Sequence, residues 1–532
     1  MRSFDPRLSG TIALTSGPLS LTGDLVIAGP GADRLAVSGS DASRVFDVAA
    51  GTAVNLVGLT VSHGSAAQGA GIRNAGLLSL FQVVLADNAA VNDAGNAEGG
   101  GIFNASGAAL VASDTTFANN VANAHPGAVA GSLPGARGGG LYNEGDAVLD
   151  HSTFTANVAV GSGGGFTTGA RGGAIWNGSA DPPSGPAATL SITASTLTDN
   201  QAVGLAGAAG EYGGRALGGA VFNRYATVTI RHITLSGNLA TAGPSGAGVP
   251  GNFGGGGAIA NTTAGTLTST VTIQDSTLSG NLAQGGAGAE GFSGGNGDGG
   301  VLYNESELTI SGSTLTGNGA FGGAGGSAPG GGNFDGSGLG GAVMNSIIAH
   351  VTISLSTLSG NQAVGGPGSG TGAGGRGGGG ALYDESLTAL TLDQSKVSDN
   401  QAVGGDGGAT GPGGGGLGGG LAHVASNPLT ITGTTFTGNL AQGGAGGAGR
   451  NGGLALGGGL YLSGGPVCIE QSSVTGNAAL GGPAGMGGQD GPGVGGGVFI
   501  ASGTVGARDT DISGNYASTS NDDVFGELGE CP

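Results

Sequence analysis

The sequence predicts an all-β fold, a parallel β-helix (β-solenoid) with about twelve regular coils of roughly 39 residues and less regular coils before them. Three observations lead to this prediction. A unit of about 39 residues recurs along the chain, each copy contains short β-branched or Leu-rich runs, and no window has the apolar spacing of an amphipathic helix. A β-propeller would need about four strands and aromatic signatures in each unit, whereas this chain has one Trp.

Glycine is the most unusual part of the composition, with 128 copies in 532 residues. Such a content without a Gly-X-Y period is typical of disorder. Hydrophobic residues still make up 38 % of the chain and fall at fixed places in each unit, which disordered segments do not show. We therefore expect an ordered core with Gly-rich excursions, such as residues 365–380, that leave each coil at the same point.

The repeat has two halves, and each ends on Asn. In the first half a glycine pair leads into an apolar run, as in Gly340-Gly-Ala-Val-Met-Asn345; in the second a strand-like segment ends as in Leu358-Ser-Gly-Asn361. The first-half residues are Asn74, Asn104, Asn143, Asn177, Asn223, Asn261, Asn304 and Asn345, and later copies replace this Asn. The second-half residues, spaced by 32 to 43 positions, are Asn88, Asn120, Asn157, Asn200, Asn238, Asn281, Asn318, Asn361, Asn400, Asn439, Asn477 and Asn515. An Asn that faces a bend can donate to one coil and accept from the next, so we interpret both series as structural ladders.

The repeat divides the chain into three parts. Residues 1–68 contain strand-length runs without the repeat and are expected to form less regular coils, with a start that is truncated. Residues 69–517 are the repeat β-helix with lateral Gly-rich loops, and residues 518–532 are a C-terminal tail. The two cysteines, Cys468 and Cys531, can form a disulfide that fixes this tail or remain as two thiols, and the sequence leaves both open.

The net charge of the chain limits which binding partners can be expected. The net charge is −20, with 14 Lys plus Arg against 34 Asp plus Glu. Nucleic-acid binding requires clustered cations, and the cations are scattered in the sequence, so we expect no nucleic-acid partner. No apolar stretch is long enough to cross a membrane as a helix. The first residues lack the apolar core of a signal peptide.

The motifs resemble a known family. The pairing of Gly-Gly-Ala-(Ile/Leu/Val) with Phe-x-x-Asn resembles the repeat of the polymorphic outer-membrane proteins, and Phe117-Ala-Asn-Asn120, Phe154-Thr-Ala-Asn157 and Phe436-Thr-Gly-Asn439 match the second motif literally. More widely, the whole chain resembles bacterial secreted proteins of the pectin-lyase-like class. The resemblance implies a right-handed parallel β-helix and an extracellular or cell-surface location, with a secretion signal upstream of this chain. It implies function only weakly, because fold does not fix activity.

Candidate sites are few. Two segments match the calcium-binding nonapeptide motif in part, Gly294-Gly-Asn-Gly-Asp298 and residues 333–336. Loosely bound Ca²⁺ is therefore the one metal that we consider. A polysaccharide lyase or hydrolase would need carboxylates grouped with Arg in a groove, and the sequence shows no such group. We assign no catalytic, cofactor-binding or metal-binding residue. Outward hydroxyl columns, read from Thr153/Thr155, Thr196/Thr198, Thr234/Ser236, Thr277/Ser279, Thr314/Thr316, Thr357/Ser359 and Thr435/Thr437, resemble the flat faces of ice-binding solenoids.

The function expected from the sequence is that of a secreted or surface-exposed, non-enzymatic rod with an adhesin-like or structural display role and a surface glycan or protein as its ligand. The alternative is a carbohydrate-active β-helix enzyme, a lyase or hydrolase. Binding to ice or another crystalline surface is a third hypothesis. The sequence does not indicate an oligomeric state.

Overall fold

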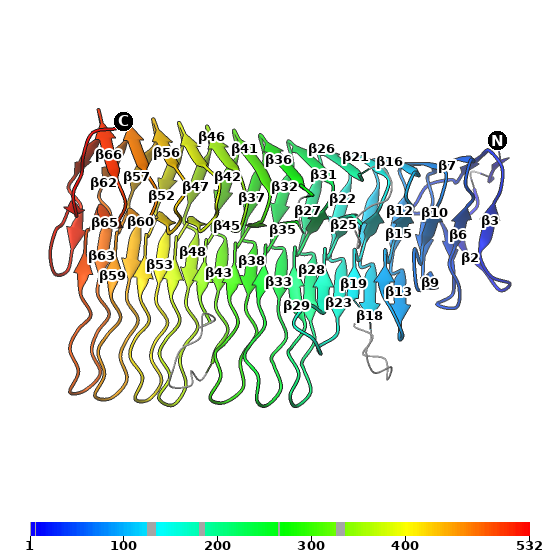
Figure 1. Ribbon diagram of the computed structural model, residues 1–532. Helices are drawn as coiled ribbons and strands as arrows, with labels where there is room; N and C mark the ends of the chain where they lie inside the picture. The colour runs from blue at the N-terminus through cyan, green and yellow to red at the C-terminus, as the bar shows by residue number, and fades with distance from the viewer. Residues whose placement is uncertain are drawn as a thin grey trace.

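The computed structural model describes residues 2–5, 7–124, 135–179, 187–263, 267–325 and 336–531. It shows a right-handed parallel β-helix and confirms the predicted fold class. The coils lie side by side along a rod, from the N-terminus to the C-terminus (Figure 1). Five parallel sheets, named A to E, run along it: within the described residues, sheets A, B and C have 15 strands each, sheet D has 13 and sheet E has 11. No helix occurs in the described part of the chain.

One coil from the middle of the rod illustrates the repeat. It passes through β36 (Thr270–Gln274) of sheet A, β37 (Thr277–Ser279) of sheet B and β38 (Leu282–Gln284) of sheet D. A Gly-rich loop then leads back through β39 (Gly297–Asp298) of sheet E and β40 (Leu302–Asn304) of sheet C. Each strand pairs with the equivalent strand of the next coil, so residues of equal repeat position form columns along the rod.

The sheets extend over different lengths of the chain. Sheet A runs from β1 (Arg2–Ser3) to β66 (Val505–Arg508), sheet B from β2 (Gly10–Ala13) to β67 (Asp511–Ser513) and sheet D from β9 (Ser65–Ala66) to β68 (Tyr516–Ala517). The strands of sheet C are β3 (Leu19–Leu21), β6 (Phe46–Val48), β10 (Ile72–Asn74), β15 (Ile102–Asn104), β20 (Leu141–Asn143), β25 (Ile175–Gly178), β30 (Val221–Arg224), β35 (Ile259–Thr262), β40 (Leu302–Asn304), β45 (Val343–Asn345), β50 (Leu382–Asp384), β55 (Leu421–His423), β60 (Leu460–Ser463), β65 (Val498–Ser502) and β69 (Val524–Phe525). The strands of sheet E are β14 (Ala97–Glu98), β19 (Gly135–Arg137), β24 (Gly169–Arg171), β29 (Arg215–Leu217), β34 (Gly254–Gly255), β39 (Gly297–Asp298), β44 (Gly338–Leu339), β49 (Gly377–Gly378), β54 (Gly416–Leu417), β59 (Ala455–Leu456) and β64 (Gly493–Val494).

An aliphatic core fills the space between sheets A, B and C. Strand alternation directs every second side chain inward. In β26 (Thr189–Thr193), Leu190 and Ile192 are buried, and the Thr residues at both ends of the strand are not. The inward side chains form one continuous hydrophobic cluster along the rod, from Leu21 to Val505. Burial of this apolar surface, worth about 25 cal/mol per Å², is the main force that holds coil upon coil.

Two columns of Asn side chains run through the interior. In the first-half column, each Nδ2 donates to the Oδ1 of the next coil's Asn, at 2.7 to 3.0 Å from Asn74 to Asn345. In the second-half column the same bonds measure 2.8 to 3.0 Å from Asn88 to Asn515. Each Asn also binds backbone groups, so buried N–H and C=O groups at the bends find partners inside the rod.

The first-half column changes chemistry after Asn345. Its Nδ2 donates to the Oδ1 of Asp384 at 2.7 Å, and the Oδ2 of Asp384 lies 2.7 Å from the Nδ1 of His423. Both side chains are fully buried. The hydroxyl of Ser386 also donates to Asp384, at 2.8 Å. A buried polar side chain needs such partners, and this network supplies them to Asp384 where the Asn repeat stops.

Sheets D and E form a thin layer that extends from the body. In the first coils they pack on each other through a cluster of buried Ala side chains: Ala90, Ala97, Ala122, Ala124, Ala136, Ala159, Ala170, Ala202, Ala216 and Ala240. Beyond this layer the Gly-rich loops stack into a flat projection that we call the fin, visible below the body in Figure 1. Its two arms are joined by backbone hydrogen bonds that alternate within and between coils, as from Gly453 to Gly444 and from Gly444 to Gly414. The glycine content therefore reflects close packing of backbone on backbone.

The two ends differ from the middle. Residues 1–68 contribute strands to sheets A, B and C, and sheet D starts only at β9. In the tail, β69 adds the last strand to sheet C, and Asp523 accepts from the Nδ2 of Asn515 at 3.0 Å. Cys468 and Cys531 form a disulfide across 63 residues. The tail thus covers the end of the second Asn column and is covalently fixed to sheet A.

Candidate functional site

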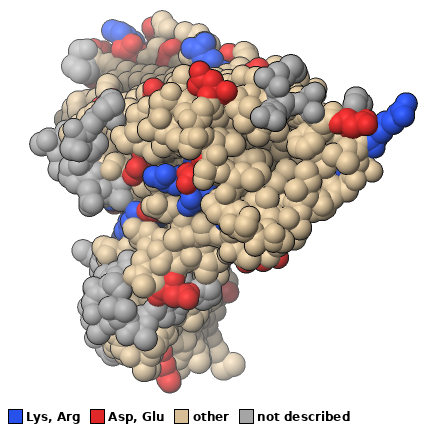
Figure 2. Space-filling view, turned by 90° about the vertical axis from the view of Figure 1, so that its right-hand side faces the viewer, with Lys and Arg blue, Asp and Glu red and all other residues tan. Residues whose placement is uncertain are grey.

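A groove runs along the rod where the outer face of sheet C meets the base of the fin. Figure 2 shows it end-on as a hollow between the body and the fin, with basic and acidic side chains gathered inside. The sheet C column that faces it is Arg73, Phe103, Tyr142, Trp176, Phe222, Ala260, Tyr303, Met344, Tyr383, Ala422, Tyr461, Phe499 and Phe525. The sheet E column is Glu98, Arg137, Arg171, Leu217, Gly255, Asp298, Leu339, Gly378, Leu417, Leu456 and Val494.

Three adjoining pockets make up the groove, with volumes of about 450, 470 and 400 Å³. The first and second share Phe253 and Tyr303, and the second and third share Arg376. They extend from the coil of β19 to the coil of β64, which is nine steps along sheet E. At about 4.8 Å per step the groove is roughly 40 Å long.

The first pocket contains four arginines, which we call the Arg cradle: Arg137, Arg171, Arg215 and Arg224. The first two are register partners in sheet E, and the others come from the start of β29 and the end of β30. Each guanidinium lies over an aromatic ring: Arg137 is 5.0 Å from the centroid of Trp176, Arg171 is 6.0 Å from Phe222, Arg215 is 5.5 Å from Phe253 and Arg224 is 4.9 Å from Tyr225. The aromatic rings hold the guanidinium groups in place by cation–π attraction.

The aromatic rings below the Arg cradle stack on each other and are shielded from solvent. Tyr142 and Trp176 have centroids 5.7 Å apart, and Trp176 and Phe222 are 4.4 Å apart. All three side chains are buried. Their faces are therefore occupied by neighbouring rings and by arginines, so they support the cradle and do not offer a flat platform to a ligand.

The cradle has fewer carboxylate partners than charges. Arg137 pairs with Glu98 at 2.8 Å, whereas Arg171, Arg215 and Arg224 have no carboxylate within 4.0 Å among the described residues. Burial lowers the pKa of Arg171 well below its ordinary value, and the nearby positive charges of Arg215, Arg137 and Arg224 lower it further. Burial also lowers the pKa of Arg215. Both shifts have the sign expected of buried cations, and for Arg215 the nearby Tyr303 and Glu305 oppose the shift without cancelling it.

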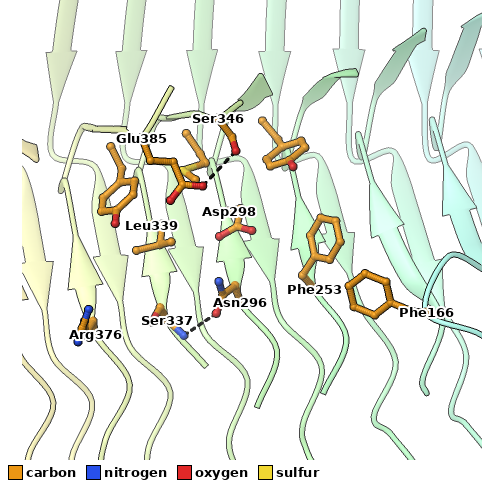
Figure 3. Close-up of a pocket in the computed structure, with 12 residues that line it drawn as sticks. Phe166, Phe253, Asn296, Asp298, Ser337, Leu339, Ser346, Arg376 and Glu385 are labelled. Atoms are coloured by element: carbon orange, nitrogen blue, oxygen red, sulfur yellow. Dashed lines mark hydrogen bonds between the residues drawn. The ribbon is translucent and has the colours of Figure 1, made fainter. Parts of the chain in front are cut away.

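The second pocket is centred on Asp298, the last residue of β39. Figure 3 shows its carboxyl between Leu339 and Phe253, with Ser346 and Glu385 on one side. The Oδ1 atom of Asp298 is buried and has no hydrogen-bond partner. Burial raises the pKa of this carboxyl well above its usual range, and the nearby Glu385 raises it further. Both effects favour the protonated form of Asp298, which is the form that can donate a proton into the groove.

Polar side chains surround this acid. The hydroxyl of Ser346 donates to Glu385 at 3.0 Å, and Tyr303 donates to Glu305 at 2.7 Å. Loss of solvation raises the pKa of Glu385, while the hydrogen bond from Ser346 opposes that rise. Burial, followed by the charge of Glu305, raises the pKa of Tyr303 well above its usual range. Asp298, Glu305 and Glu385 thus lie in two adjoining pockets that also contain arginines, which is the grouping that the sequence alone did not show.

The third pocket is less polar. It is formed by Leu417, Leu454 and Tyr461 together with glycines of the fin, and Arg376 closes it toward the second pocket. A Cβ on Gly453 would lie 1.8 Å from the carbonyl oxygen of Gly414, so the wall formed by the fin can exist only with glycine at such positions.

The residues singled out from the sequence lie elsewhere. Both Asn series are inside the rod, and the Thr and Ser columns lie on the outer face of sheet B in register from coil to coil. Of the two segments near the calcium motif, residues 294–298 lead into the second pocket, and residues 333–335 lie outside the described residues. Within the described part, one group of three potential metal-ligating side chains occurs, Cys468, Glu470 and Cys531, and its two thiols are joined in the disulfide.

Sequence reasoning missed the cradle and Asp298 because the residues are far apart in the chain. A signal was nevertheless present. The sheet E residue that faces the groove directly precedes the glycine pair of each repeat, as in Arg137-Gly-Gly, Arg171-Gly-Gly and Asp298-Gly-Gly. Alignment of the repeats on that pair would have placed these side chains in one column.

No helix that could cross a membrane is found among the described residues. No protein-family model and no curated protein matches the sequence. Two solved structures have a similar fold. The catalytic unit of a thermostable GH87 α-1,3-glucanase from Streptomyces thermodiastaticus is 12 % identical, with 90 % of this chain and 61 % of that chain covered and a TM-score of 0.30. The periplasmic alginate epimerase AlgG is 8 % identical, with 98 % and 85 % covered and a TM-score of 0.23. This chain thus spans about 61 % of the glucanase unit, and likenesses at this level assign no activity to it.

Proposed function

We propose that the groove binds a linear polysaccharide along the axis of the rod, and that the protein is a secreted or surface-exposed rod with an adhesin-like or structural display role. The observation that carries this proposal is the continuity of the three pockets over roughly 40 Å. A small ligand needs one pocket, whereas an extended polymer needs a long open groove.

The lining suits a polyhydroxylated ligand. Ser337, Ser346, Tyr383 and Arg376 supply donors and acceptors along the second pocket, and apolar side chains such as Phe253 lie between them. Sugars present hydroxyl groups and apolar ring faces together, so a lining of this mixed kind fits them. The disulfide between Cys468 and Cys531 supports an oxidising compartment such as the cell exterior.

Replacement of Phe253 by Ala tests this proposal. Phe253 lies where the first and second pockets meet, so a polymer in the groove would contact it from both pockets. We expect its loss to weaken polysaccharide binding about 10- to 30-fold, or roughly 1.4 to 2 kcal/mol, because a few aromatic contacts dominate binding energies. Affinity electrophoresis against linear neutral and acidic polysaccharides identifies a ligand, and titration calorimetry with its hexasaccharide gives the Kd.

Phe81→Ala is the matched control, since Phe81 is 44 % exposed at the end of β11 (Leu77–Phe81) in sheet A, away from the groove. Equal weakening by both variants, or binding of no polysaccharide by the wild-type chain, would contradict the proposal. Binding of a protein ligand at the groove would replace it.

A second candidate function is hydrolysis of the bound polysaccharide. The buried carboxyl of Asp298, with its raised pKa and its unpartnered Oδ1 atom, favours this function. In this reaction Asp298 donates its proton to the glycosidic oxygen as the bond to the sugar carbon breaks. Water adds its oxygen to that carbon, and its proton passes to Glu385. One water is consumed per bond cleaved, and two carboxyl groups fill the two roles that such hydrolysis needs.

Asp298→Asn tests this second function. An amide cannot donate the proton, so the variant should release reducing ends at least about 10²-fold more slowly than the wild type. The wild-type rate should fall as pH rises through the raised pKa of Asp298. The carboxyl of Asp298 ionises at a lower pH in the unfolded chain than in the folded one. The folded wild type therefore loses stability as pH rises from the unfolded pKa to the folded pKa, and Asp298→Asn does not. The melting temperature of the variant should rise relative to that of the wild type over this pH range. Absence of reducing ends from the wild type would leave the rod as a binding protein only.

A further inference from the structure

We infer that the groove selects an anionic polysaccharide, and that the Arg cradle binds the carboxylate or sulfate group of one of its sugars. This inference rests on the proposed function and names the ligand class for the same groove. Its starting point is the concentration of charge: the chain has 14 basic side chains and a net charge of −20, yet four of those 14 line one pocket.

The protein itself neutralises only part of this charge. Glu98 pairs with Arg137, and Glu305, which lines the same pocket, accepts hydrogen bonds from Tyr303 and from the backbone N–H of Thr263. Arg171 is 8 % exposed and has no carboxylate partner among the described residues. A buried cation without a counter-charge is unfavourable, and an anionic ligand would supply that counter-charge.

The arginines of the cradle also have hydrogen-bond donors without partners. The Nε atoms of Arg137, Arg171, Arg215 and Arg224 are buried without a partner, and the guanidinium of Arg171 has one described hydrogen bond, to the backbone oxygen of Thr167 at 2.6 Å. A guanidinium presents five N–H donors in a planar fork that fits a carboxylate or a sulfate. The rings beneath the guanidinium groups fix them in advance, which lowers the entropy lost on binding.

Two other anionic polymers fit less well. Single-stranded nucleic acids bind through stacking of bases on aromatic faces, and the faces of Tyr142, Trp176 and Phe222 are covered. A double helix carries its phosphates on a rigid backbone, whereas the four arginines line a pocket of about 450 Å³. An acidic polysaccharide is narrower, and it presents its oxyanions on a flexible, hydroxylated chain.

The test compares Arg171→Met with the wild type by calorimetry against a galacturonate hexamer, a sulfated dextran oligosaccharide and neutral cellohexaose, and by melting temperature. The matched control is Arg231→Met, which removes an exposed arginine at the end of β31 (Thr227–Arg231) in sheet A. We expect Arg171→Met to weaken binding of one or both anionic probes at least about 10-fold, to leave any cellohexaose binding within about 2-fold, and to raise the melting temperature in the absence of ligand. The two anionic probes distinguish a carboxylate from a sulfate ligand.

Equal weakening of charged and neutral probes would overturn the inference and leave the polysaccharide groove in place. A lower melting temperature with unchanged affinity would also overturn it, because Arg171 would then be structural. If no oligosaccharide binds, the proposed function fails, and the cradle is judged with inorganic sulfate: stabilisation of the wild type but not of Arg171→Met supports an anion site. Tighter binding of a single-stranded oligonucleotide than of either acidic sugar would reject the ligand class.

Discussion

Replacement of Asn281 by Ala should lower the free energy of unfolding by roughly 3–5 kcal/mol. The Nδ2 of Asn281 donates to the backbone oxygen of Leu235 at 3.1 Å and to the Oδ1 of Asn318 at 3.0 Å. Its Oδ1 accepts from the backbone N–H and from the Nδ2 of Asn238, at 3.1 and 2.9 Å. Alanine would leave these buried groups in adjacent coils without partners, at about 1–3 kcal/mol for each unsatisfied group.

Urea unfolding measures the loss, and hydrogen exchange locates it. In a repeat protein each coil contacts its neighbours, so backbone amides of the coils on either side of Asn281 should exchange faster before the ends of the rod do. Asn451→Ala is the control, because Asn451 is exposed in the fin and its side chain accepts one hydrogen bond, from the N–H of Gln489. That variant should lose less than about 1 kcal/mol. A similar loss for both variants would show that the Asn column contributes no special stability.

Gly419→Ala should be about as harmful, with a loss of roughly 3–5 kcal/mol, although only one methyl group is added. Gly419 is the second glycine of a repeat pair, at the bend between sheets E and C. A Cβ there would lie 2.3 Å from the carbonyl oxygen of Gly458 and 2.4 Å from the carbonyl carbon of Leu440. Both are backbone atoms held in the hydrogen-bonded stack of coils, so neither can move away alone.

The measurement is again urea unfolding, with Gly280→Ala as the comparison. Gly280 has a φ of 61°, and no atom lies within 4 Å of the position that an added methyl group would take, so its replacement involves backbone strain without a clash. A loss of about 1 kcal/mol is expected there, the energy of placing a non-glycine residue in the left-handed region. Gly419→Ala would be tolerated equally well only if adjacent coils can separate locally, and that outcome would refute the packing argument.

Stacking of equivalent residues has different effects inside the rod and on the groove face. Columns of equivalent residues are stabilising inside the rod, where Asn pairs with Asn and Leu with Leu. On the groove face the same stacking brings Arg137 and Arg171 into adjacent positions, where like charges repel, and Glu98 pairs with Arg137 alone. The repeat architecture therefore concentrates charge in a protein whose overall charge has the opposite sign.

The sequence by itself determined the fold class. Strand-length apolar runs, a repeat near 39 residues and the absence of helical spacing leave few architectures, because side-chain periodicity and repeat length are local properties of the chain. The recurrence of one Asn at each bend also follows from the sequence, since each coil must satisfy its own buried backbone groups.

Only the tertiary structure decided where the candidate site lies. Arg137, Arg171 and Arg224 are separated by tens of residues, and loops of unequal length between them hide their common position in the coil. Whether Asp298 belongs to a loop motif or to a buried groove depends on the packing of sheet E against sheet C, which has no local signature. The same holds for the disulfide, since pairing of Cys468 with Cys531 requires the tail to return to sheet A. The burial of these side chains and their distances from one another depend on how the coils stack, so they cannot be derived from the sequence of a single repeat.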